Sequence, residues 1–376
     1  MWYMNEEREQ LQKMVREFTA TEVKPFVKEM EEHDTYPHKL LKKAGELGII
    51  GLMFPEKAGG FGPRWVDMGI CLEEIAKESN TFAMCLSSLH AGTSMLVQIG
   101  NEEQIDKIVK PIVAGESVIA GAQCEPTGVA RLQDFQTTAS FEGGECVING
   151  GKIFCTNAGE SDYYSVTCKT KKPYASPLGE YTIVLVPKDA PGFKVGHIEN
   201  KMGWHGSSTG QIYFNNCRVP MSNVLASFDM DGFGGAFSIG ILLAAGQLGS
   251  AEGVFQKTLS YAKERMHGDK SLFDSYQAMR HTFAELWMEI EEFRGLVYGV
   301  LEDLDRGDMT VMGRAWAAKV KGARMFEHVA SECLVLNGGN GTIVENGIER
   351  YLRDAKMNSI GCFALPHIVD IISEML

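Results

Sequence analysis

The sequence predicts an α+β protein, mainly helical, in which a β region separates two helical regions. Three observations support this prediction. Apolar residues recur at helical spacing toward both ends of the chain, β-branched and aromatic residues alternate with polar ones in between, and turn signals separate the alternating segments. We expect an N-terminal helical domain over residues 1–114, a middle antiparallel β domain over 115–228 and a C-terminal four-helix bundle over 229–376.

The N-terminal region has the pattern of short helices separated by breakers. Apolar residues between Met14 and Val27 lie at helical spacing among glutamates and lysines, and a Tyr-Pro pair interrupts the pattern before a short helix over 38–47. The stretch 55–63, PEKAGGFGP, is typical of a glycine-rich loop. Two further helices are expected over 65–77 and 81–99.

The middle and C-terminal regions differ sharply in the periodicity of their apolar residues. Alternating segments at Cys146–Asn149, Tyr181–Val186 and Gln211–Phe214 indicate strands, and glycine and asparagine pairs between such segments indicate turns. After residue 229 the apolar residues return to helical spacing, most clearly over 283–297. The sequence contains no internal repeat and no low-complexity linker.

Composition limits the classes of function. With 376 residues, of which 44% are hydrophobic, the chain has ample material for a core. The net charge of −13 argues against nucleic acid as a partner, since phosphates require clustered lysine and arginine. The longest apolar run, 237–248, is too short to cross a membrane, so no span is expected. The N-terminus lacks the pattern of a secretory signal, and the nine scattered cysteines favour a reducing cytoplasm.

Six short segments carry the functional signal. Glycines at a helix end let the backbone approach a bulky ligand, because no Cβ stands in the way. An arginine pairs phosphate oxygens through its planar fork, and hydroxyl groups in a loop can bond a carbonyl. Each segment alone also has an ordinary structural explanation, such as a helix cap, a hairpin turn or a buried strand. The segments are Gln123–Arg131, Lys152–Asn157, Lys201–Thr209, Glu264–Gly268, Gly338–Gly341 and Arg353–Lys356.

Taken together, these segments resemble the acyl-CoA dehydrogenase family, flavoproteins that oxidise an acyl thioester between its α and β carbons. The resemblance covers nearly the whole chain and implies an acyl-CoA dehydrogenase-like fold with FAD as cofactor. It implies that the loop at Gln123 and Cys124 lies along the flavin. It also implies that Phe154 packs beside the flavin and that the Thr156 hydroxyl lies near its reactive nitrogen.

The resemblance also implies an oligomer. In the family, the residues matched by Arg265, Gly338 and Gly339 contact the cofactor of a neighbouring subunit. We therefore expect a homo-oligomer, either a dimer or a tetramer, built through the C-terminal helices. An electron-transfer flavoprotein is the partner that the resemblance suggests for disposal of electrons.

This chain departs from the family pattern at the residues that carry the chemistry. Cys362 stands where the family's catalytic glutamate belongs. Ile239 stands at the position that some branches use for that glutamate, and Gly240 replaces an arginine beside it. Ala130 replaces a serine that the resemblance places near substrate and cofactor. His90, on a helix that lines the pocket in relatives, is a candidate base, although a satisfied core histidine explains it as well.

Three hypotheses follow. The first is an FAD-dependent enzyme that acts on an acyl thioester, carried by CoA or by acyl carrier protein, with altered acid/base chemistry. The second is a catalytically silent subunit that pairs with a glutamate-bearing paralogue. The third is a flavoprotein that performs non-redox elimination or oxygen chemistry. Under all three, Cys362 is expected to be a poor base, since a free thiol has a pKa near ~8.5, burial raises it, and its sequence neighbours supply no cation.

Overall fold

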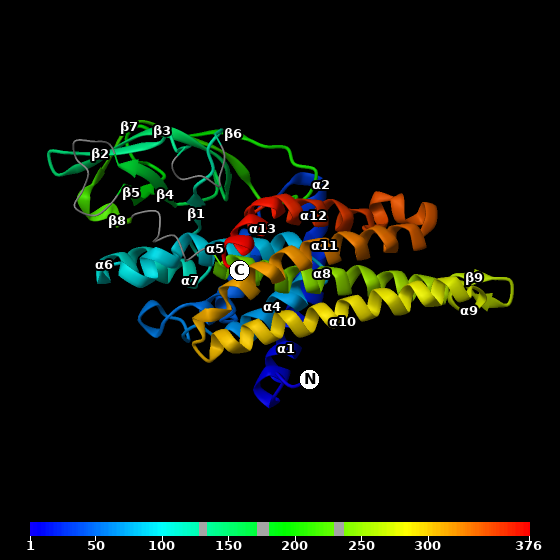
Figure 1. The fold of residues 1–376 in the computed structure, drawn as a ribbon. Coiled ribbons are helices and arrows are strands. Elements are labelled where there is room, and N and C mark those ends of the chain that lie inside the picture. The colour runs from blue at the N-terminus through cyan, green and yellow to red at the C-terminus, as the bar shows by residue number, and fades with distance from the viewer. Residues whose placement is uncertain (128–133, 171–179, 229–236) are drawn as a thin grey trace.

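The computed structural model describes residues 1–127, 134–170, 180–228 and 237–376. Helices from both ends of the chain lie side by side, and the β region sits over one end of them (Figure 1). The predicted order of helices, sheet and helices is confirmed. The N-terminal helices are α1 (Glu6–Phe18), α2 (Lys24–His33), α3 (His38–Glu46), α4 (Trp65–Ala76), α5 (Asn80–Ile99), α6 (Glu102–Gln104) and α7 (Lys110–Val113).

Local sequence signals explain where several of these helices begin. The side chain of Asn5 accepts a bond from the N–H of Arg8 and caps α1, and Ser79 caps α5 by accepting from Phe82. Pro25 lies in the first turn of α2, which continues directly from a π-helical turn over Thr19–Val23. The helices expected over 65–77 and 81–99 are confirmed as α4 and α5.

Helix α5 corrects one expectation about apolar runs. Its twenty residues include no Asp, Glu, Lys or Arg, so by length and composition it could cross a membrane. The expectation that no segment reaches this length without a charged residue is therefore wrong. More than half of the helix is buried, and it packs against α4, α8 and β1. A buried core helix meets the same criteria as a membrane span, and this packing accounts for its composition.

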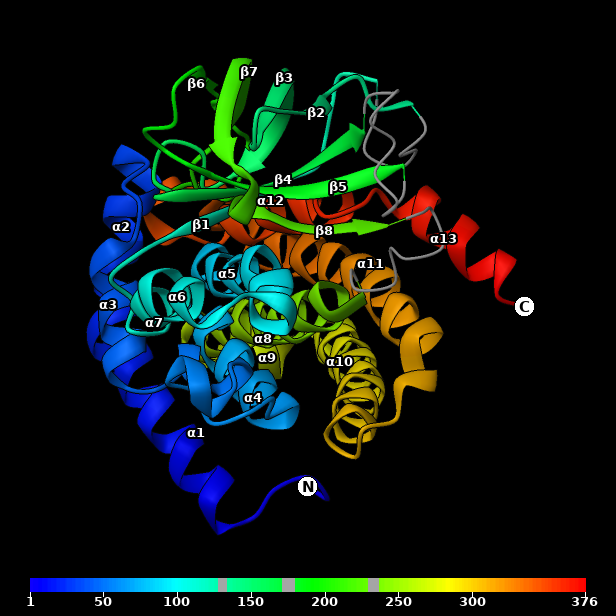
Figure 2. The same ribbon diagram turned by 90° about the vertical axis from the view of Figure 1, so that its left-hand side faces the viewer.

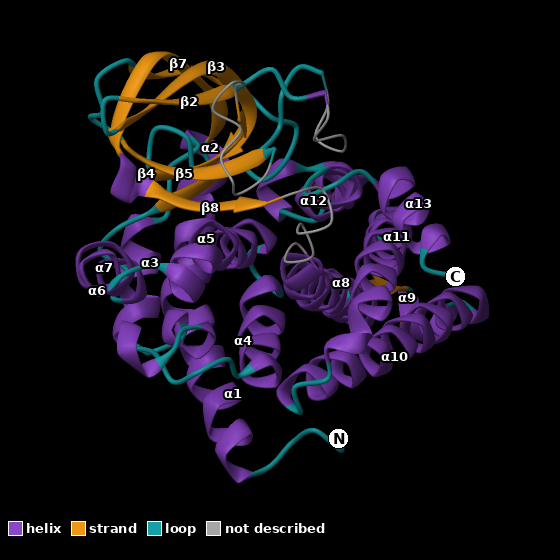
Figure 3. Cartoon of the chain, turned by 60° about the vertical axis from the view of Figure 1, so that its left-hand side comes forward, coloured by secondary structure: helices purple, strands orange, loops and turns teal. Residues whose placement is uncertain are grey.

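The β region forms one strongly curved sheet above α5 (Figure 3). Among the described residues the order is β6-β7-β3-β2-β4-β5-β8, with β1 also paired to β4. Most pairs are antiparallel, as expected, and β1 and β2 both run parallel to β4. The strands are β1 (Ile119–Ala122), β2 (Thr138–Glu142), β3 (Glu145–Thr156), β4 (Tyr163–Thr170), β5 (Tyr181–Pro187), β6 (Phe193–Ile198), β7 (Thr209–Pro220) and β8 (Val224–Phe228).

Three long helices dominate the C-terminal region and run beside the N-terminal helices (Figure 2). A two-stranded ribbon, β9 (Met266–His267) and β10 (Lys270–Ser271), separates α8 from the short α9. Gly249 and Gly253 of α8 allow close contact with α4, because a Cβ at either position would lie 2.0–2.2 Å from a carbonyl oxygen of α4 or of its cap. The helices are α8 (Phe237–Glu264), α9 (Leu272–Ser275), α10 (Gln277–Asp305), α11 (Met312–Leu336), α12 (Glu349–Ile360) and α13 (Leu365–Glu374).

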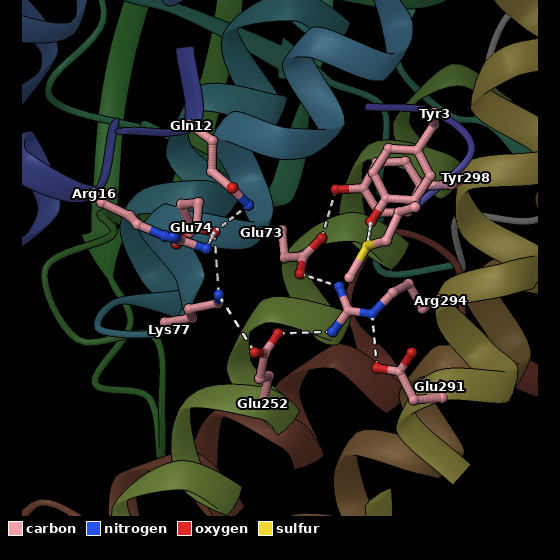
Figure 4. Close-up of polar contacts among 11 residues, drawn as sticks. Tyr3, Gln12, Arg16, Glu73, Glu74, Lys77, Glu252, Glu291, Arg294 and Tyr298 are labelled. Atoms are coloured by element: carbon pink, nitrogen blue, oxygen red, sulfur yellow. Dashed lines mark hydrogen bonds and ion pairs between the residues drawn. The ribbon is translucent and has the colours of Figure 1, made fainter. Parts of the chain in front are cut away.

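A buried network of charged side chains joins α4 to α8 and α10 (Figure 4). Arg294 of α10 bonds Glu73 of α4, and its second terminal nitrogen lies 2.7 Å from Glu252 of α8. Its Nε lies 3.0 Å from Glu291, and the Tyr298 hydroxyl donates to Glu73 at 2.5 Å. Arg294 and Glu73 are almost wholly buried, so this network links three helices in the interior rather than on the surface.

Candidate functional site

The turn after α12 presents Cys362 in an uncommon backbone conformation. Gly361 caps the helix, its N–H donating to the Met357 carbonyl at 2.7 Å. Cys362 and Phe363 then both have positive φ, 50° and 70°. A residue other than glycine in this region costs on the order of 1–2 kcal/mol. Two successive residues with positive φ, neither of them glycine, are retained only where surrounding contacts stabilise that backbone conformation.

Lys319 of α11 is one of the groups that hold this turn. Its side chain is fully buried, and Nζ donates to the carbonyls of Asn358 at 3.1 Å and Phe363 at 2.9 Å. Burial lowers the pKa of Lys319 to about 8, and nearby Cys362 opposes that shift. Burial raises the pKa of the Cys362 thiol, and Lys319 limits the rise. The sequence neighbours of Cys362 supply no cation, as expected, but Lys319 supplies one from another helix.

The Lys201–Thr209 segment contacts α12 from the other side of the turn. The Trp204 N–H donates to the Asp354 carboxylate at 2.7 Å, and the indole Nε1–H donates to Asn80 at 2.8 Å. The indole lies against Gly361, where a Cβ would come within 2.6 Å of the ring. Burial raises the pKa of Asp354 to about 6. Two segments that the sequence singled out separately therefore pack together and position Cys362.

The loop at Gln123 and Cys124 is fastened to β3 by a buried ion pair. Lys152 Nζ lies 2.7 Å from Glu125 Oε1 and donates to the Gln123 carbonyl at 3.1 Å. The Ile153 N–H donates to the Cys124 carbonyl at 2.8 Å. Burial acts to raise the pKa of Glu125, but the bond from Lys152 and backbone N–H donors hold it below its usual value. This pair fixes the loop, and sequence reasoning missed it although both residues lie inside segments it had singled out.

A β-bulge in β3 turns Phe154 outward. The register between β3 and β7 shifts between Lys152 and Cys155, and Phe154 has a φ of 50°. The Phe154 side chain is 61% exposed, which is unusual for a phenylalanine in a sheet. Two residues further on, the Thr156 hydroxyl has no hydrogen-bond partner among the described residues. An exposed aromatic face and a free hydroxyl on one strand end are suited to a planar ligand.

The structure brings the Cys124 loop and the Cys362 turn close to each other. Burial raises the pKa of Cys124 to about 11, and Cys362 is the next contributor to that rise. Cys124 also contributes to the raised pKa of the Cys155 thiol in β3. The β region and the C-terminal helices therefore meet at one site, with Cys362 on one side and the Cys124 loop on the other.

A second group of predicted residues lines a separate cavity. Arg265, Gly338 and Gly339 lie together with Tyr261 and Asn340 around a volume of about 560 Å³. The Arg265 side chain is exposed and makes no ion pair among the described residues. A Cβ at Gly338 or Gly339 would meet open space, so the cavity wall there is bare backbone. The cavity lies at the far end of the long helices from the β region (Figure 1).

Two other candidates stand apart from these groups. His90 packs edge-on against Phe54 and Trp65, with ring centroids 6.2 and 6.0 Å away. Burial lowers the pKa of His90 to about 4, so it is neutral at physiological pH and a weak base. This environment is that of a core histidine. Ala130 lies outside the described residues.

Comparison with known proteins decides the family. The acyl-CoA dehydrogenase N-terminal, middle and C-terminal domains match residues 5–116, 120–217 and 240–362. The chain belongs to the acyl-CoA dehydrogenase family. It is 33% identical over 365 residues to an acyl-CoA dehydrogenase of Bacillus subtilis, with 95% of this chain and 94% of that protein covered. It is 30% identical over 365 residues to CarC, a subunit of the caffeyl-CoA reductase-Etf complex of Acetobacterium woodii, covering 95% of each.

Solved structures show the same fold. The butyryl-CoA dehydrogenase of Megasphaera elsdenii superposes with a TM-score of 0.91 at 28% identity, covering 99% of this chain and 98% of that one. Acyl-CoA dehydrogenases are FAD-dependent, so the fit of FAD can be tested on this chain's own residues. The exposed ring of Phe154, the free hydroxyl of Thr156 and the bare backbone beside Arg265 all suit it.

Sequence reasoning also missed Lys319, which carries the only charge acting on Cys362 among the described residues. A signal was present, since Lys319 is a charged residue among the apolar positions of a predicted helix: Trp316 and Val320 beside it are buried. If this side of the helix is predicted to face the core, Lys319 is predicted to be a buried cation, which is rare without a functional or structural role.

Proposed function

We propose that this acyl-CoA dehydrogenase is an FAD-dependent enzyme that acts on an acyl thioester at the Cα–Cβ bond with non-standard acid/base chemistry. The observation that supports it best is the outward ring of Phe154, held at positive φ by a bulge beside the free hydroxyl of Thr156. The strained, exposed Phe154 is left largely uncovered by the described residues, whereas a planar cofactor would cover it.

Bound FAD would supply the acceptor for the hydride that leaves the β-carbon. The chain's own residues would bind and orient it. The backbone at Gln123 and Cys124 would lie along the cofactor, and Thr156 would donate its hydroxyl. Arg265 would pair with phosphate oxygens, where a planar fork gives bidentate contacts.

We further propose a homo-oligomer, either a dimer or a tetramer. Phe154 and Thr156 belong to β3, whereas Arg265, Gly338 and Gly339 line a cavity near the ends of α8 and α11 that lie away from the β region (Figure 1). We propose that a neighbouring chain supplies the second group to each cofactor. Light scattering should give a dimer or tetramer, and a flavin-loaded monomer would contradict the proposal.

The CarC protein belongs to a complex with Etf. By that likeness we propose an electron-transfer flavoprotein as the electron acceptor, and we expect a cytoplasmic location. CoA and acyl carrier protein are both candidate carriers of the thioester.

The test is the visible spectrum of the purified protein before and after anaerobic addition of acyl-CoAs of increasing chain length. We expect bound flavin, and bleaching that is slow at neutral pH because burial raises the pKa of Cys362, so the thiol stays protonated where a carboxylate would be ionised. Cys362→Glu should bleach faster than wild type with butyryl-CoA or a longer acyl-CoA. Protein that stays colourless in excess FAD would refute the proposal.

A catalytically silent subunit is the second candidate. It is favoured by Cys362 and Ile239, which leave both of the family's glutamate positions without a carboxylate. Such a subunit would purify stably only with a glutamate-bearing paralogue, and Cys362→Glu would not produce bleaching in the homo-oligomer. Recovery of bleaching in that variant would instead show that the site is otherwise complete.

A further inference from the structure

Asn157 follows the last residue of β3, is fully buried, and uses every polar group of its side chain. Its Oδ1 accepts a hydrogen bond from the Tyr36 hydroxyl at 2.9 Å. Its Nδ2 donates to the Ser88 hydroxyl at 3.2 Å and to the Ile119 carbonyl at 3.1 Å. These partners come from the segment between α2 and α3, from α5 and from β1, so one side chain joins the end of β3 to three other parts of the chain.

The backbone at this position also requires an unusual residue. The φ of Asn157 is 68°, in the left-handed region that asparagine tolerates better than most residues other than glycine. Its N–H donates to the Ser208 carbonyl at 2.7 Å, and its carbonyl accepts from the Ser161 N–H at 3.1 Å. Glycine would permit this backbone but has no side chain, and an aspartate has no N–H to donate to the Ile119 carbonyl. Asparagine meets both requirements, a left-handed backbone and a side chain with one acceptor and two donors.

The hydrogen bonds of Asn157 act on a short strand end. The register between β3 and β7 is interrupted between Lys152 and Cys155, and beyond this bulge the described pairing with β7 consists of Cys155 and Thr156. Phe154 lies within the bulge, and its ring and the Thr156 hydroxyl are the groups that we assign to the cofactor. Because Asn157 follows Thr156 directly, its bonds fix where these two groups lie relative to the helices.

We propose that Asn157 is a positioning residue, which fixes the end of β3 against the N-terminal helices so that the Phe154 ring and the Thr156 hydroxyl are held in place for a planar cofactor. This inference rests on the proposed function, because FAD is the ligand that these two groups would contact. Asn157 is fully buried, so it acts through its neighbours in β3 and does not touch the cofactor. A strand end that is already ordered binds its ligand without the entropic cost of ordering it.

Replacing Asn157 with glycine tests the proposal, because glycine keeps the positive φ and removes the three side-chain hydrogen bonds. The apparent Kd for FAD is measured by flavin fluorescence in flavin-stripped protein. It should rise about tenfold, as expected for a strand end that holds the binding geometry only about a tenth of the time.

Asn216→Gly is the matched control. Asn216 also has a positive φ, 47°, and its side chain accepts a hydrogen bond from Asn149 at 3.2 Å, but it is exposed and lies on β7. Its replacement should leave the affinity for FAD unchanged. Wild-type affinity in Asn157→Gly, or an equal loss in Asn216→Gly, would overturn the positioning role.

A milder pair of variants separates positioning from simple stabilisation of the fold. Tyr36→Phe removes the hydroxyl that donates to Asn157 and keeps the ring, whereas Thr156→Val removes the hydroxyl that we assign to the cofactor. If the Tyr36 hydroxyl acts on FAD through the end of β3, Tyr36→Phe should weaken FAD binding less in the Thr156→Val background than in wild type. Fully additive effects of the two changes would contradict the positioning role, because a tether that only stabilises the fold gives additive effects.

Hydrogen exchange in the flavin-free proteins gives a readout that does not depend on the cofactor. Peptides covering residues 153–161 should exchange faster in Asn157→Gly than in wild type or in Asn216→Gly, because the strand end is no longer fixed. Unchanged exchange would overturn the inference. A wild-type protein that stays colourless in excess FAD would refute the proposed function, whereas faster exchange in Asn157→Gly would still support the fixing of the β3 end by Asn157.

Discussion

Replacing Arg294 with methionine should be among the most damaging single changes outside the site. Arg294 is the shared cation of a network in which Glu73 is almost fully buried and Glu252 largely so. Methionine fills similar space but provides no donor to Glu73, which keeps the hydrogen bond from the Tyr298 hydroxyl. Removing one partner of a buried ion pair leaves the other charge buried without a counter-ion, which lowers the free energy of unfolding by roughly 3–5 kcal/mol.

That cost can be converted into a shift in denaturant midpoint. For a urea dependence on the order of 3 kcal/mol per molar, a loss of about 4 kcal/mol lowers the midpoint by about 1 M or slightly more. The assay is urea unfolding followed by the helical circular dichroism signal, because α4, α8 and α10 all meet at this network.

Arg314→Met is the matched control. Arg314 pairs with Asp303 at 2.7 Å on the surface, where its side chain is half exposed, so its loss should cost less than about 1 kcal/mol. An Arg294→Met midpoint within about 0.3 M of that of Arg314→Met would show that the buried network contributes little, and the argument from burial would be wrong.

Three further changes test the positioning of the site. Burial raises the pKa of Asp354 to about 6, so the folded state binds more protons than the unfolded state between pH 4 and 6. Wild type should gain about 2.4 kcal/mol relative to Asp354→Asn as pH falls from 7 to 4, and thermal melts across that range should show it. Gly361→Ala should destabilise by about 1–3 kcal/mol, since its Cβ would meet the Trp204 ring at 2.6 Å, whereas Gly295→Ala, in open space on a helix, should be neutral or stabilising in the same thermal melts. Lys152→Met should lower the urea midpoint by about 1 M, because it leaves the Glu125 carboxylate buried without its partner. It should also weaken FAD binding in a fluorescence titration, because Glu125 adjoins the Gln123–Cys124 loop. An unchanged midpoint together with unchanged FAD affinity would contradict the anchoring role of Lys152.

Much of the fold could be predicted because helices and strands are set by local periodicity. The apolar spacing at 283–297 and the alternation at Tyr181–Val186 both lie within the elements that the structure shows. Strand pairing could not be predicted in the same way. β1 and β2 run parallel to β4 because the chain crosses between them, and no local signal encodes such non-local partners.

The site was only partly predictable for the same physical reason. The family resemblance singled out Cys362, Phe154 and Arg265, because each occupies a position that a family motif assigns to the site. The partners that decide their chemistry come from elsewhere in the chain. Lys319 reaches Cys362 from a different helix, and the bulge that exposes Phe154 depends on the pairing of β3 with β7.

The turn at Cys362 bears on whether the chain is an altered enzyme or a silent subunit. Its two successive left-handed residues cost on the order of 2–4 kcal/mol in total, and the turn is held by Lys319, by Trp204 against Gly361 and by the rings around Phe363. A scaffold needs only that α12 and α13 be joined, which an unstrained turn would achieve. Strain that the surroundings retain at Cys362, where we propose that the family's glutamate is replaced, supports a side chain that still has to point in a defined direction. Bleaching by Cys362→Glu in the homo-oligomer is therefore the observation that separates the two hypotheses, because a silent subunit would lack the rest of the site and would not gain it.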